Sequence, residues 1–458
     1  MALKRFSGSF RDPAGRVFLQ NGVAFRRIHP AGRESYERLM HSGLYDSLAR
    51  DGLLVRHEDL GPRPDQPGAI TIIRPEQVAM LSYPYEWCFS QFRDAALLTL
   101  RVQRRALEFG MSLKDASAYN VQFVAGRPIL IDTLSLEPYT PGPWLAYRQF
   151  CQHFYAPLLL AARVDPRMVR MQQLFVDGMP IGLASGLLPR SSWLRAGPLL
   201  HVHLHALGER RWAASNDAVR SLDRPASSPR ATLALVDSLE RAIEGVHWSP
   251  RGNWASYYED QTSYSPESFA HKVNVVTGWF ERIKPSRVWD LGANTGYFSK
   301  LSARQGALTV ALDADPACVE ALCQEARRGN IAGLLPLVFD LTSPSPAIGW
   351  ANEERMSLEE RGPADVVVAL ALVHHVSIGN NVPLTAFADY LARLGRHLIV
   401  EFVPKSDPMA KRMLTTREEV FDDYTGDRFE QAFAARFVIN ERVALTRSSR
   451  VIYLMTLR

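Results

Sequence analysis

The stretch Asp290-Leu-Gly292-Ala-Asn294-Thr-Gly296-Tyr-Phe decides the fold, and the apolar segment Arg287-Val-Trp leads into it. This segment predicts a buried strand that ends in a glycine turn. Gly292 and Gly296 let the backbone pass close to a ligand, and Asn294 is among the non-glycine residues that best tolerate a positive φ. A helical pattern follows over residues 296–304, and the N-terminal amides of that helix would point at the bound group.

Strand-like and helix-like segments alternate after this turn. Strands are predicted at residues 308–313, 334–340, 364–373 and 396–402, with a helix at 316–328. Such alternation implies a parallel sheet with right-handed crossovers. The last strand-like segments, 437–443 and 450–457, have no helix between them and predict a closing antiparallel hairpin. The predicted fold class is therefore α/β, with a Rossmann-like, seven-stranded sheet in the C-terminal third.

The turn matches a known cofactor-binding pattern. Its spacing differs from the GxGxxG of nicotinamide-binding proteins, because Asn294 and Tyr297 occupy two of the glycine positions. Asp290, Gly292 and Gly296 instead fit D/E-x-G-x-x-x-G, and the segment resembles the class I S-adenosylmethionine-dependent methyltransferases. That resemblance implies S-adenosyl-L-methionine as the cofactor. Many relatives carry glycine where this chain has Asn294, and asparagine suits the same backbone geometry.

The resemblance also gives the matching residues roles. It implies that Asp290 meets the methionine amino group, directly or through water. It places Gly292, Asn294 and Gly296 under the methionine and the ribose. Asp313 ends the second strand, where a carboxylate can accept hydrogen bonds from the ribose hydroxyls.

Other residues near the predicted sheet have two readings each. Asp340 closes the third strand, where the family often places an acid against the adenine amino group, whereas Asp315 before Pro316 reads as a helix cap. Tyr258 lies in an aromatic segment that forms either a lid over the cofactor or a linker packed on the sheet. Lys272 would reach a carboxylate of cofactor or lid, or face solvent. The long insertion at residues 349–355 is a candidate substrate wall.

The candidate catalytic residues follow the fourth predicted strand. His374 and His375 come at its end, at the sheet edge where doubly wound folds bind ligands. A neutral imidazole there could remove a proton from a hydroxyl acceptor, and His374 aligns with the catalytic histidine of many small-molecule O-methyltransferases. The alternative is that the histidines only cap the strand or its loop. Glu401, at the end of the fifth strand, faces the acceptor or forms a structural salt bridge.

The N-terminal half has a different organisation. Residues 15–28 predict a β-hairpin with its turn at Asn21-Gly22, and helices are predicted at 36–51 and 89–110, the second with a glycine C-cap. Residues 143–155 predict a buried helix, and the stretch 221–229 is the best linker candidate.

Three polar residues in this half resemble the catalytic core of protein kinases and aminoglycoside phosphotransferases. Asp115 and Asn120 have the spacing of the catalytic loop, and Asp132 follows a predicted hairpin where those enzymes bind a metal ion. Leu113 stands where the family usually has histidine, and neither a glycine-rich phosphate loop nor a strand lysine is evident. The half is therefore expected to be an α+β, kinase-like accessory domain, or else a helix–hairpin unit whose acids cap turns.

Histidines and cysteines give no metal site. His201, His203 and His205 would share a face on a strand, but no acid or cysteine accompanies them, and surface histidines are the default expectation. Cys88, Cys151, Cys318 and Cys323 form no CxxC pair, which suggests free thiols in a reducing compartment.

Composition sets limits on partners. The chain has 458 residues, 47% of them hydrophobic, and its 53 basic and 48 acidic residues give a net charge of +5. No dense Lys/Arg block marks a nucleic-acid patch. No apolar run approaches the roughly 20 residues of a membrane span, and no secretion signal follows Met1. We expect a cytoplasmic protein; the sequence specifies no oligomeric state.

Together these features predict an N-terminal accessory domain (1–225), a helical linker and cofactor lid (226–285) and a cofactor-binding domain (286–458). The whole chain also resembles the bacterial methyltransferase-like proteins among the rhizobial host-specific nodulation proteins, from Gly8-Ser-Phe-Arg-Asp-Pro and Ser82-Tyr-Pro-Tyr-Glu-Trp to the C-terminal end. The main functional hypothesis is O-methylation of a small-molecule or glycan-precursor acceptor. The alternatives are a bifunctional protein with N-terminal phosphotransferase activity, and a non-catalytic binding module that keeps the fold and has lost the cofactor.

Overall fold

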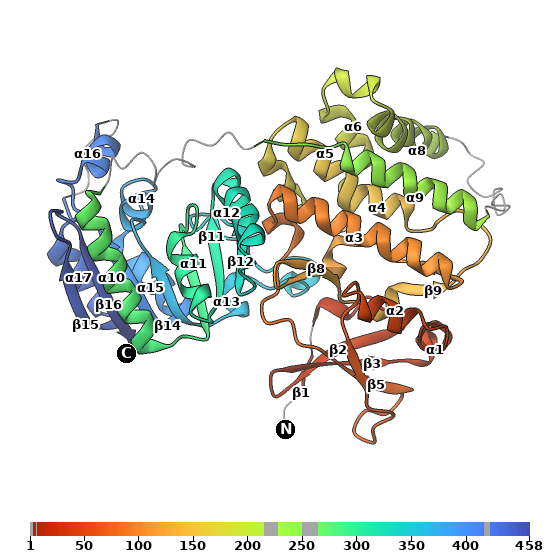
Figure 1. Cartoon of the computed structure of the whole chain (residues 1–458), viewed down its shortest axis with the longest axis horizontal. Helices are drawn as coiled ribbons and strands as arrows, with labels where there is room; N and C mark the ends of the chain where they lie inside the picture. The colour runs from red at the N-terminus through yellow and green to blue at the C-terminus, as the bar shows by residue number, and fades with distance from the viewer. Residues whose placement is uncertain (1–2, 6, 215–227, 250–263, 416–421) are drawn as a thin grey trace. The chain divides into compact units, whose positions relative to one another are not determined.

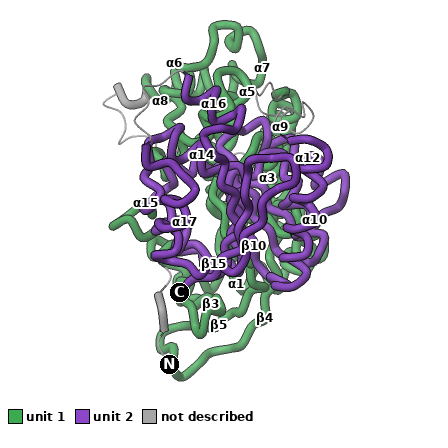
Figure 2. Tube along the Cα trace, turned by 90° about the vertical axis from the view of Figure 1, so that its left-hand side faces the viewer, with its two compact units in different colours: residues 1–249, 347–355 green, residues 250–346, 356–458 purple. Residues whose placement is uncertain are grey.

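The computed structural model describes residues 3–5, 7–214, 228–249, 264–415 and 422–458. The chain divides into two compact units (Figures 1 and 2). The N-terminal unit comprises Met1–Ser249 and Ala347–Arg355, and the C-terminal unit comprises Pro250–Pro346 and Met356–Arg458. None of the helices in the described ranges is long and apolar enough to cross a membrane.

An antiparallel sheet opens the N-terminal unit, with the strand order β1-β2-β3-β5-β4. Its strands are β1 (Leu3–Arg5), β2 (Gly15–Gln20), β3 (Val23–Ile28), β4 (His57–Asp59) and β5 (Thr71–Pro75). β2 and β3 form the predicted hairpin. Asn21 (φ 54°) and Gly22 (φ 79°) both adopt positive φ at its turn, as a two-residue type I′ loop requires.

The helix predicted over 36–51 is instead two helices, α1 (Arg33–His41) and α2 (Leu44–Arg50). Gly43, between them, has a φ of 83°, a left-handed conformation that breaks a helix and that glycine adopts at little cost. The amphipathic pattern continues across the break, because both helices bury one face, and so the pattern alone does not reveal it.

A long helix and two short strand pairs follow. α3 (Phe89–Glu108) agrees with the prediction, and Gly110 beyond it has a φ of 68°. β6 (Met111–Leu113) pairs with β9 (Leu136–Pro138), and β7 (Val121–Val124) pairs with β8 (Arg127–Leu130). The loop between β6 and β7 carries Asp115 and Asn120.

A helical layer completes the N-terminal unit. It contains α4 (Tyr147–Phe150), α5 (Ala156–Arg163), α6 (Ile181–Leu187), α7 (Ala196–Pro198), α8 (His205–Ala214) and α9 (Pro229–Glu244). The predicted buried helix at 143–155 is confirmed from Tyr147 onward, and Phe150, Phe154 and Tyr155 are fully buried there. α9 packs against α3, and Arg104 of α3 pairs with Asp237 and Glu240 of α9. Residues 226–285 therefore do not form a separate unit, and most of the linker candidate 221–229 lies outside the described residues.

The expectation of surface histidines is wrong for two of the three. His201 and His203 are fully buried in a π-helical turn, Leu199–Leu204. His201 contacts the hydroxyl groups of Tyr147 and Ser238, and the ring nitrogens of His203 contact those of Ser185 and Ser192. These hydroxyl partners satisfy the rings, so the histidines are part of the helical core.

A mixed sheet forms the centre of the C-terminal unit, with the strand order β12-β11-β10-β13-β14-β16-β15. The strands are β10 (Arg287–Leu291), β11 (Leu308–Asp313), β12 (Leu334–Val338), β13 (Ala364–Ala369), β14 (Gly395–Phe402), β15 (Phe437–Ala444) and β16 (Val451–Leu457). The pairings from β12 to β14 are parallel, and β16 is antiparallel to both β14 and β15. The Rossmann-like, mixed sheet expected from the sequence is confirmed.

Helices cover this sheet. They are α10 (Pro266–Ile283), α11 (Tyr297–Arg304), α12 (Pro316–Arg328), α13 (Leu358–Arg361), α14 (Val373–Ser377), α15 (Leu384–Leu394), α16 (Pro408–Leu414) and α17 (Gly426–Ala434). Trp279 and Phe280 of α10 and Phe298 of α11 share one core cluster with β10, β13, β14 and β16. α15 packs on β13 and β14, and α17 packs on β15 (Figure 1). The cofactor turn thus starts from the buried centre of the sheet.

A buried charge cluster ties several of these elements together. The Glu401 carboxylate at the end of β14 contacts Lys272 Nζ of α10 at 2.6 Å and accepts hydrogen bonds from Tyr264 Oη and the Ala371 amide, each at 2.8 Å. Arg450 lies 3.7 Å from Glu401 and donates to Asp407 at 2.7 Å. The predicted structural salt bridge of Glu401 is therefore confirmed, and Lys272 is buried within it, not exposed to solvent.

Breaking this cluster on one side leaves an unpaired buried charge. We therefore expect Lys272→Met to lower the free energy of unfolding by about 3–5 kcal/mol, and the double variant Lys272→Met/Glu401→Gln to recover part of that loss. Denaturant titration measures both. The matched control is Lys300→Met, which removes a half-exposed pair with Glu325 and should cost about 1 kcal/mol or less. Equal losses in the two single variants would contradict the central role of the buried pair.

Candidate functional site

The glycine turn after β10 has the backbone geometry that its sequence predicts. Gly292 (φ 68°), Asn294 (φ 51°) and Gly296 (φ 70°) all adopt positive φ. The amides of Gly292 and Ala293 donate to the carbonyl of Leu312 at 2.8 and 3.0 Å, which anchors the turn to β11. A Cβ on Gly292 would lie 2.9 Å from Leu372, and one on Gly296 would lie 2.5 Å from Leu322. Neighbouring side chains therefore leave no room for larger residues at either glycine.

A cavity of about 260 Å³ lies at the carboxyl ends of the parallel strands, and we call it the C-terminal cavity. Five of the predicted site residues line it: Gly292, Asn294, Asp313, Asp340 and His375. The wall also includes residues that the sequence did not single out, namely Ala314, Phe339, Leu341, Thr342, Leu370, Ala371, Leu372, Val376 and Asn380. Most of them come directly after β11, β12 or β13. Their contacts depend on the residue at which each strand ends, and the sequence pattern does not fix that residue.

Asp313 is held at the edge of this cavity by backbone donors. Its carboxylate accepts from the Asn294 amide at 2.7 Å and from the Asp315 amide at 2.8 Å. Burial raises the pKa of Asp313, although these hydrogen bonds favour its ionised form. Asp315 accepts from the Ala317 amide and caps α12, as predicted. Asp340 accepts from the Thr342 amide at 2.9 Å and so closes the turn after β12.

Asp290 lies deeper than its neighbours. It is buried, is absent from the lining of the C-terminal cavity, and accepts a hydrogen bond from Ser299 Oγ at 2.5 Å. Burial raises the pKa of Asp290 to about 7, and nearby Asp313 adds to this increase. Ser299, the first-turn residue of α11 that contacts it, was not predicted. The structure thus places an acid of near-neutral pKa directly beneath the glycine turn.

The two histidines lie differently from the prediction. β13 ends at Ala369, and His374 and His375 belong to the short helix α14, not to the tip of the strand. His375 lines the C-terminal cavity, whereas His374 is fully buried and both its ring nitrogens lack a hydrogen-bond partner among the described residues. Burial lowers the pKa of both rings, that of His374 to about 2. His375 is therefore the histidine that a ligand in this cavity could contact. Tyr258 lies outside the described residues.

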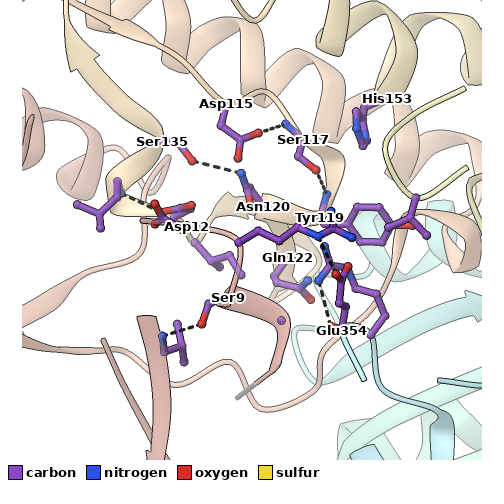
Figure 3. A pocket seen from close by; sticks show the side chains of 18 of the residues that line it. Ser9, Asp12, Asp115, Ser117, Tyr119, Asn120, Gln122, Ser135, His153 and Glu354 are labelled. Atoms are coloured by element: carbon purple, nitrogen blue, oxygen red, sulfur yellow. Dashed lines mark hydrogen bonds and ion pairs between the residues drawn. The ribbon is translucent and has the colours of Figure 1, made fainter. Parts of the chain in front are cut away.

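The polar residues of the N-terminal unit meet at a second cavity. Asp115, Asn120 and Asp132 line this cavity of about 480 Å³, which we call the N-terminal cavity. Figure 3 shows Asp115 and Asn120 in its wall. Asp115 accepts hydrogen bonds from the Ser117 amide at 3.0 Å and from Gln149 at 2.8 Å. Burial, followed by nearby Asp132, raises the pKa of Asp115. No three His, Cys, Asp or Glu side chains are grouped as metal ligands in the parts of the chain that the structure describes.

Arg26 and Gln122 form internal contacts that the sequence did not indicate, and these contacts use charged and hydrogen-bonding groups of the N-terminal cavity. Arg26 of β3 forms ion pairs with Asp132 and with Asp12. The Gln122 side chain accepts from the Ser82 amide at 2.8 Å and donates to the Ser82 carbonyl at 2.9 Å. The partners of each pair lie 14 to 106 residues apart, so no local pattern reveals them.

The insertion between β12 and β13 contributes to the same cavity. Residues 347–355 fold with the N-terminal unit, and they include the segment 349–355 that the sequence suggested as a substrate wall. Glu354 pairs with Arg11 at 2.7 Å, and the Arg355 guanidinium lies 4.3 Å from the ring centre of Tyr119. Trp350 is 70% exposed. Glu354 and Arg355 thus form a wall of the N-terminal cavity.

Strand order, glycine turn and acid-lined cavity together define a Rossmann-like domain of the class I methyltransferase type. A relative matches almost the whole chain. Nodulation protein NoeA of Rhizobium meliloti (strain 1021) is 33% identical over 461 residues, which cover 98% of this chain and 95% of the relative. The chain therefore belongs to the NoeA family. No family model matches the sequence.

Solved structures with partial similarity include two methyltransferases. Magnesium protoporphyrin IX methyltransferase from Synechocystis PCC 6803, with bound S-adenosylhomocysteine, matches 42% of this chain and 84% of its own, with 19% identity and a TM-score of 0.32. The bifunctional kinase-methyltransferase WbdD matches 44% of this chain and 42% of its own, with 15% identity and a TM-score of 0.30. The fold is assigned from the sheet and the glycine turn described above, and not from these partial similarities.

The raised pKa of Asp290 makes a testable contribution to stability. The pKa of this acid rises from 3.8 to about 7 on folding. Its burial therefore leaves the free energy of unfolding unchanged below pH 3.8 and lowers it increasingly as the pH rises toward 7. Asp290→Asn cannot ionise and escapes this loss. We expect the stability of the variant relative to wild type to rise by about 2–3 kcal/mol between pH 5 and pH 8, as measured by denaturant unfolding.

The exposed carboxyl group of Asp427 provides the control for this experiment. Asp427→Asn should change stability by a similar, small amount at both pH values. If Asp290→Asn behaved in the same way, the carboxyl group of Asp290 would not be held in its protonated form.

Proposed function

We propose that the protein is an S-adenosylmethionine-dependent methyltransferase that methylates a hydroxyl group of a small molecule or glycan precursor. The observation that carries the proposal is the C-terminal cavity, where the glycine turn and the carboxylate of Asp313 meet at the carboxyl edge of the sheet. Doubly wound folds bind their ligands at this edge. The name of the NoeA relative specifies neither a reaction nor an acceptor.

The residues present fit the proposed cofactor. Asp313 retains acceptor capacity for ribose hydroxyls, since a carboxylate offers about four acceptor sites and the backbone amides of Asn294, Ala314 and Asp315 occupy part of that capacity. Asp340 would face the adenine amino group, and Asp290 would attract the methionine ammonium group. The turn of Gly292, Asn294 and Gly296 would lie beneath the methionine and ribose. When bound, the cofactor supplies a sulfonium-activated methyl group.

The chain's own contribution to transfer is positioning and proton removal. In this proposal His375 is the catalytic base, because it lines the cavity while His374 is enclosed. Burial lowers the pKa of His375 below its ordinary 6.5, so its ring is neutral at physiological pH and its nitrogen can accept the hydroxyl proton. Holding the hydroxyl in line with the methyl group supplies the remaining acceleration.

The phosphotransferase alternative has weaker support from the side-chain contacts. Asp115, Asn120 and Asp132 share a cavity, but Arg26 neutralises Asp132, the residue that would have to bind a metal ion. The other alternative is a non-catalytic module that keeps the fold and has lost the cofactor. Failure of the wild-type protein to bind S-adenosylhomocysteine in calorimetric titration would favour that module.

Cofactor binding is tested at Gly292. A methyl group there would lie 2.9 Å from Leu372 and at a φ of 68°, so we expect Gly292→Ala to weaken S-adenosylhomocysteine binding at least tenfold in calorimetric titration. Gly306→Ala is the matched control, because Gly306 also has a positive φ (96°) but no neighbouring atom within 4 Å. If both variants bound S-adenosylhomocysteine similarly weakly, the loss would come from backbone strain alone and not from the contact with Leu372.

Proton removal is tested at His375. With labelled S-adenosylmethionine and extract of the native host, we expect His375→Gln to reduce the rate of label transfer by about 10²–10⁴-fold while S-adenosylhomocysteine binding is retained. The acid limb of the wild-type rate profile should lie below pH 6.5, since burial lowers the pKa of this ring. Full activity of His375→Gln would remove the residue from the mechanism.

A further inference from the structure

The N-terminal cavity has an electrostatic balance that limits its ligand. Of the described residues that line it, five are carboxylates and four are cationic, a formal charge of −1. The pairs of Arg26 with Asp12 and Asp132, and of Arg11 with Glu354, consume much of the positive charge. An anionic ligand such as a nucleoside triphosphate would therefore meet net repulsion unless a divalent cation came with it.

Magnesium and ATP, which a kinase-like fold implies, do not fit the residues present. Asp132 would have to hold the metal ion, but its carboxylate is bound by the Arg26 guanidinium, and Arg26 is itself buried among its acidic partners. The Leu134 amide donates to the same carboxylate at 2.8 Å. Binding a metal there would require Arg26 to leave both of its carboxylate partners.

Ser82 lies between the lining residues Leu81 and Tyr83, and its backbone groups are already hydrogen-bonded, so they offer a nucleobase no free partner. The Gln122 amide hydrogen-bonds to both the N–H and the carbonyl group of Ser82 and is itself buried. A base edge would have to displace this side chain, since Ser82 offers one donor and one acceptor.

Polar atoms that have no partner among the described residues nevertheless remain beside the cavity. His153 is only 2% exposed and lines the cavity, and its Nδ1 atom has no hydrogen-bond partner among the described residues. Burial lowers the pKa of His153 to about 4, which leaves the ring neutral. Arg26 Nε is a second buried atom without a partner in the described chain. Both unpartnered atoms belong to side chains that are more than nine-tenths buried.

The remaining wall suits hydroxyl groups. Gln149 donates to Asp115 and accepts from the Ala116 amide, each at 2.8 Å. Asn120 donates to Ser135 Oγ at 3.2 Å (Figure 3). Each carboxylate or amide oxygen has two acceptor sites, so the oxygens of this group keep capacity for hydroxyl donors. Tyr83 and Leu81 add apolar surface beside them. The volume of about 480 Å³ lies within the usual range of small-molecule sites, roughly 300–1,000 Å³.

We propose that the N-terminal cavity binds an uncharged, polyhydroxylated ligand of the carbohydrate class without a metal ion. Asp115, Asn120 and Gln149 accept and donate hydrogen bonds with the hydroxyl groups. His153 Nδ1 and Arg26 Nε face polar atoms of the same ligand. The inference concerns a different cavity from that of methyl transfer and goes beyond the proposed function.

The test uses the full chain, because Glu354 and Arg355 form part of the wall. Protein dialysed against EDTA is screened by saturation-transfer NMR with uncharged disaccharides of glucose, galactose, mannose and N-acetylglucosamine, and dissociation constants are measured by calorimetry. At least one disaccharide should bind with a Kd below about 1 mM, a modest affinity on the general scale, and adding magnesium should leave that value unchanged.

Variants assign the binding to this cavity. Asp115→Asn keeps the size of the side chain and an acceptor for the Ser117 amide, and it should weaken disaccharide binding at least tenfold. Asp46→Asn makes the same exchange at an exposed position of α2 and should leave binding unchanged. If Asp115→Asn fails to fold, Asn120→Ala serves in its place, with the same expected loss.

Three results would overturn the inference: no disaccharide binds, binding survives both cavity substitutions, or binding requires a divalent cation. Magnesium-dependent binding of ATP that the Asp132→Ala variant loses would instead support the phosphotransferase alternative. S-adenosylhomocysteine titration is run on the same samples. Because it reports on the C-terminal cavity, failure of either proposal can be told from failure of the other.

Discussion

The ion pair between Glu401 and Lys272 is the constraint on which the C-terminal unit depends. One carboxylate fully enclosed in the protein bonds to a helix before the sheet, through Lys272, and to the backbone after β13, through the Ala371 amide. Ala371 has a φ of 51°, which a non-glycine residue adopts only when its surroundings hold it there. The bond to Glu401 therefore fixes the point at which the chain leaves β13 and turns along the cavity wall. The positions of Leu372 against Gly292 and of His375 beside the cavity both follow from that turn.

Sequence patterns located the elements that local physical chemistry determines. β10, β11 and α12 follow from apolar runs, the glycine turn and the Asp315 cap, and the positive φ of Asn294 follows from the chemistry of that side chain. Sequence patterns fail where tertiary contacts determine the local backbone structure. The apolar run 364–373 contains no residue that marks the end of β13 at Ala369, because the backbone beyond it is held by a glutamate thirty positions away. The sequence therefore predicted His374 and His375 at the tip of a strand, whereas in the structure they lie in the helix α14.

Burial of individual polar residues was equally invisible in the sequence. Surface positions were expected for His201 and His203 because no acid or cysteine accompanies them, but a π-helical turn places both inside, where serine and tyrosine hydroxyls satisfy them. Asp290, Gly292, Asn294, Gly296 and Asp313 were all found at the turn or its edge. Sequence spacing did not reveal that Asp290 lies beneath the cavity while its neighbours line it. The kinase-like spacing of Asp115, Asn120 and Asp132 likewise gave no sign of Arg26, because that partner comes from a separate strand.

The excursion at residues 347–355 has a consequence for how the protein is made. The ribosome synthesises the residues of strands β1–β5 and helices α1–α9 long before it reaches Glu354 and Arg355. These two residues come after β10, β11 and β12 in the chain. Until those two residues emerge, Arg11 lacks its carboxylate partner and Tyr119 lacks the guanidinium that covers its ring. The N-terminal unit therefore stays unfinished through most of translation. Its last wall is supplied from within the sequence of the other unit, so no single cut in the chain separates the two units intact.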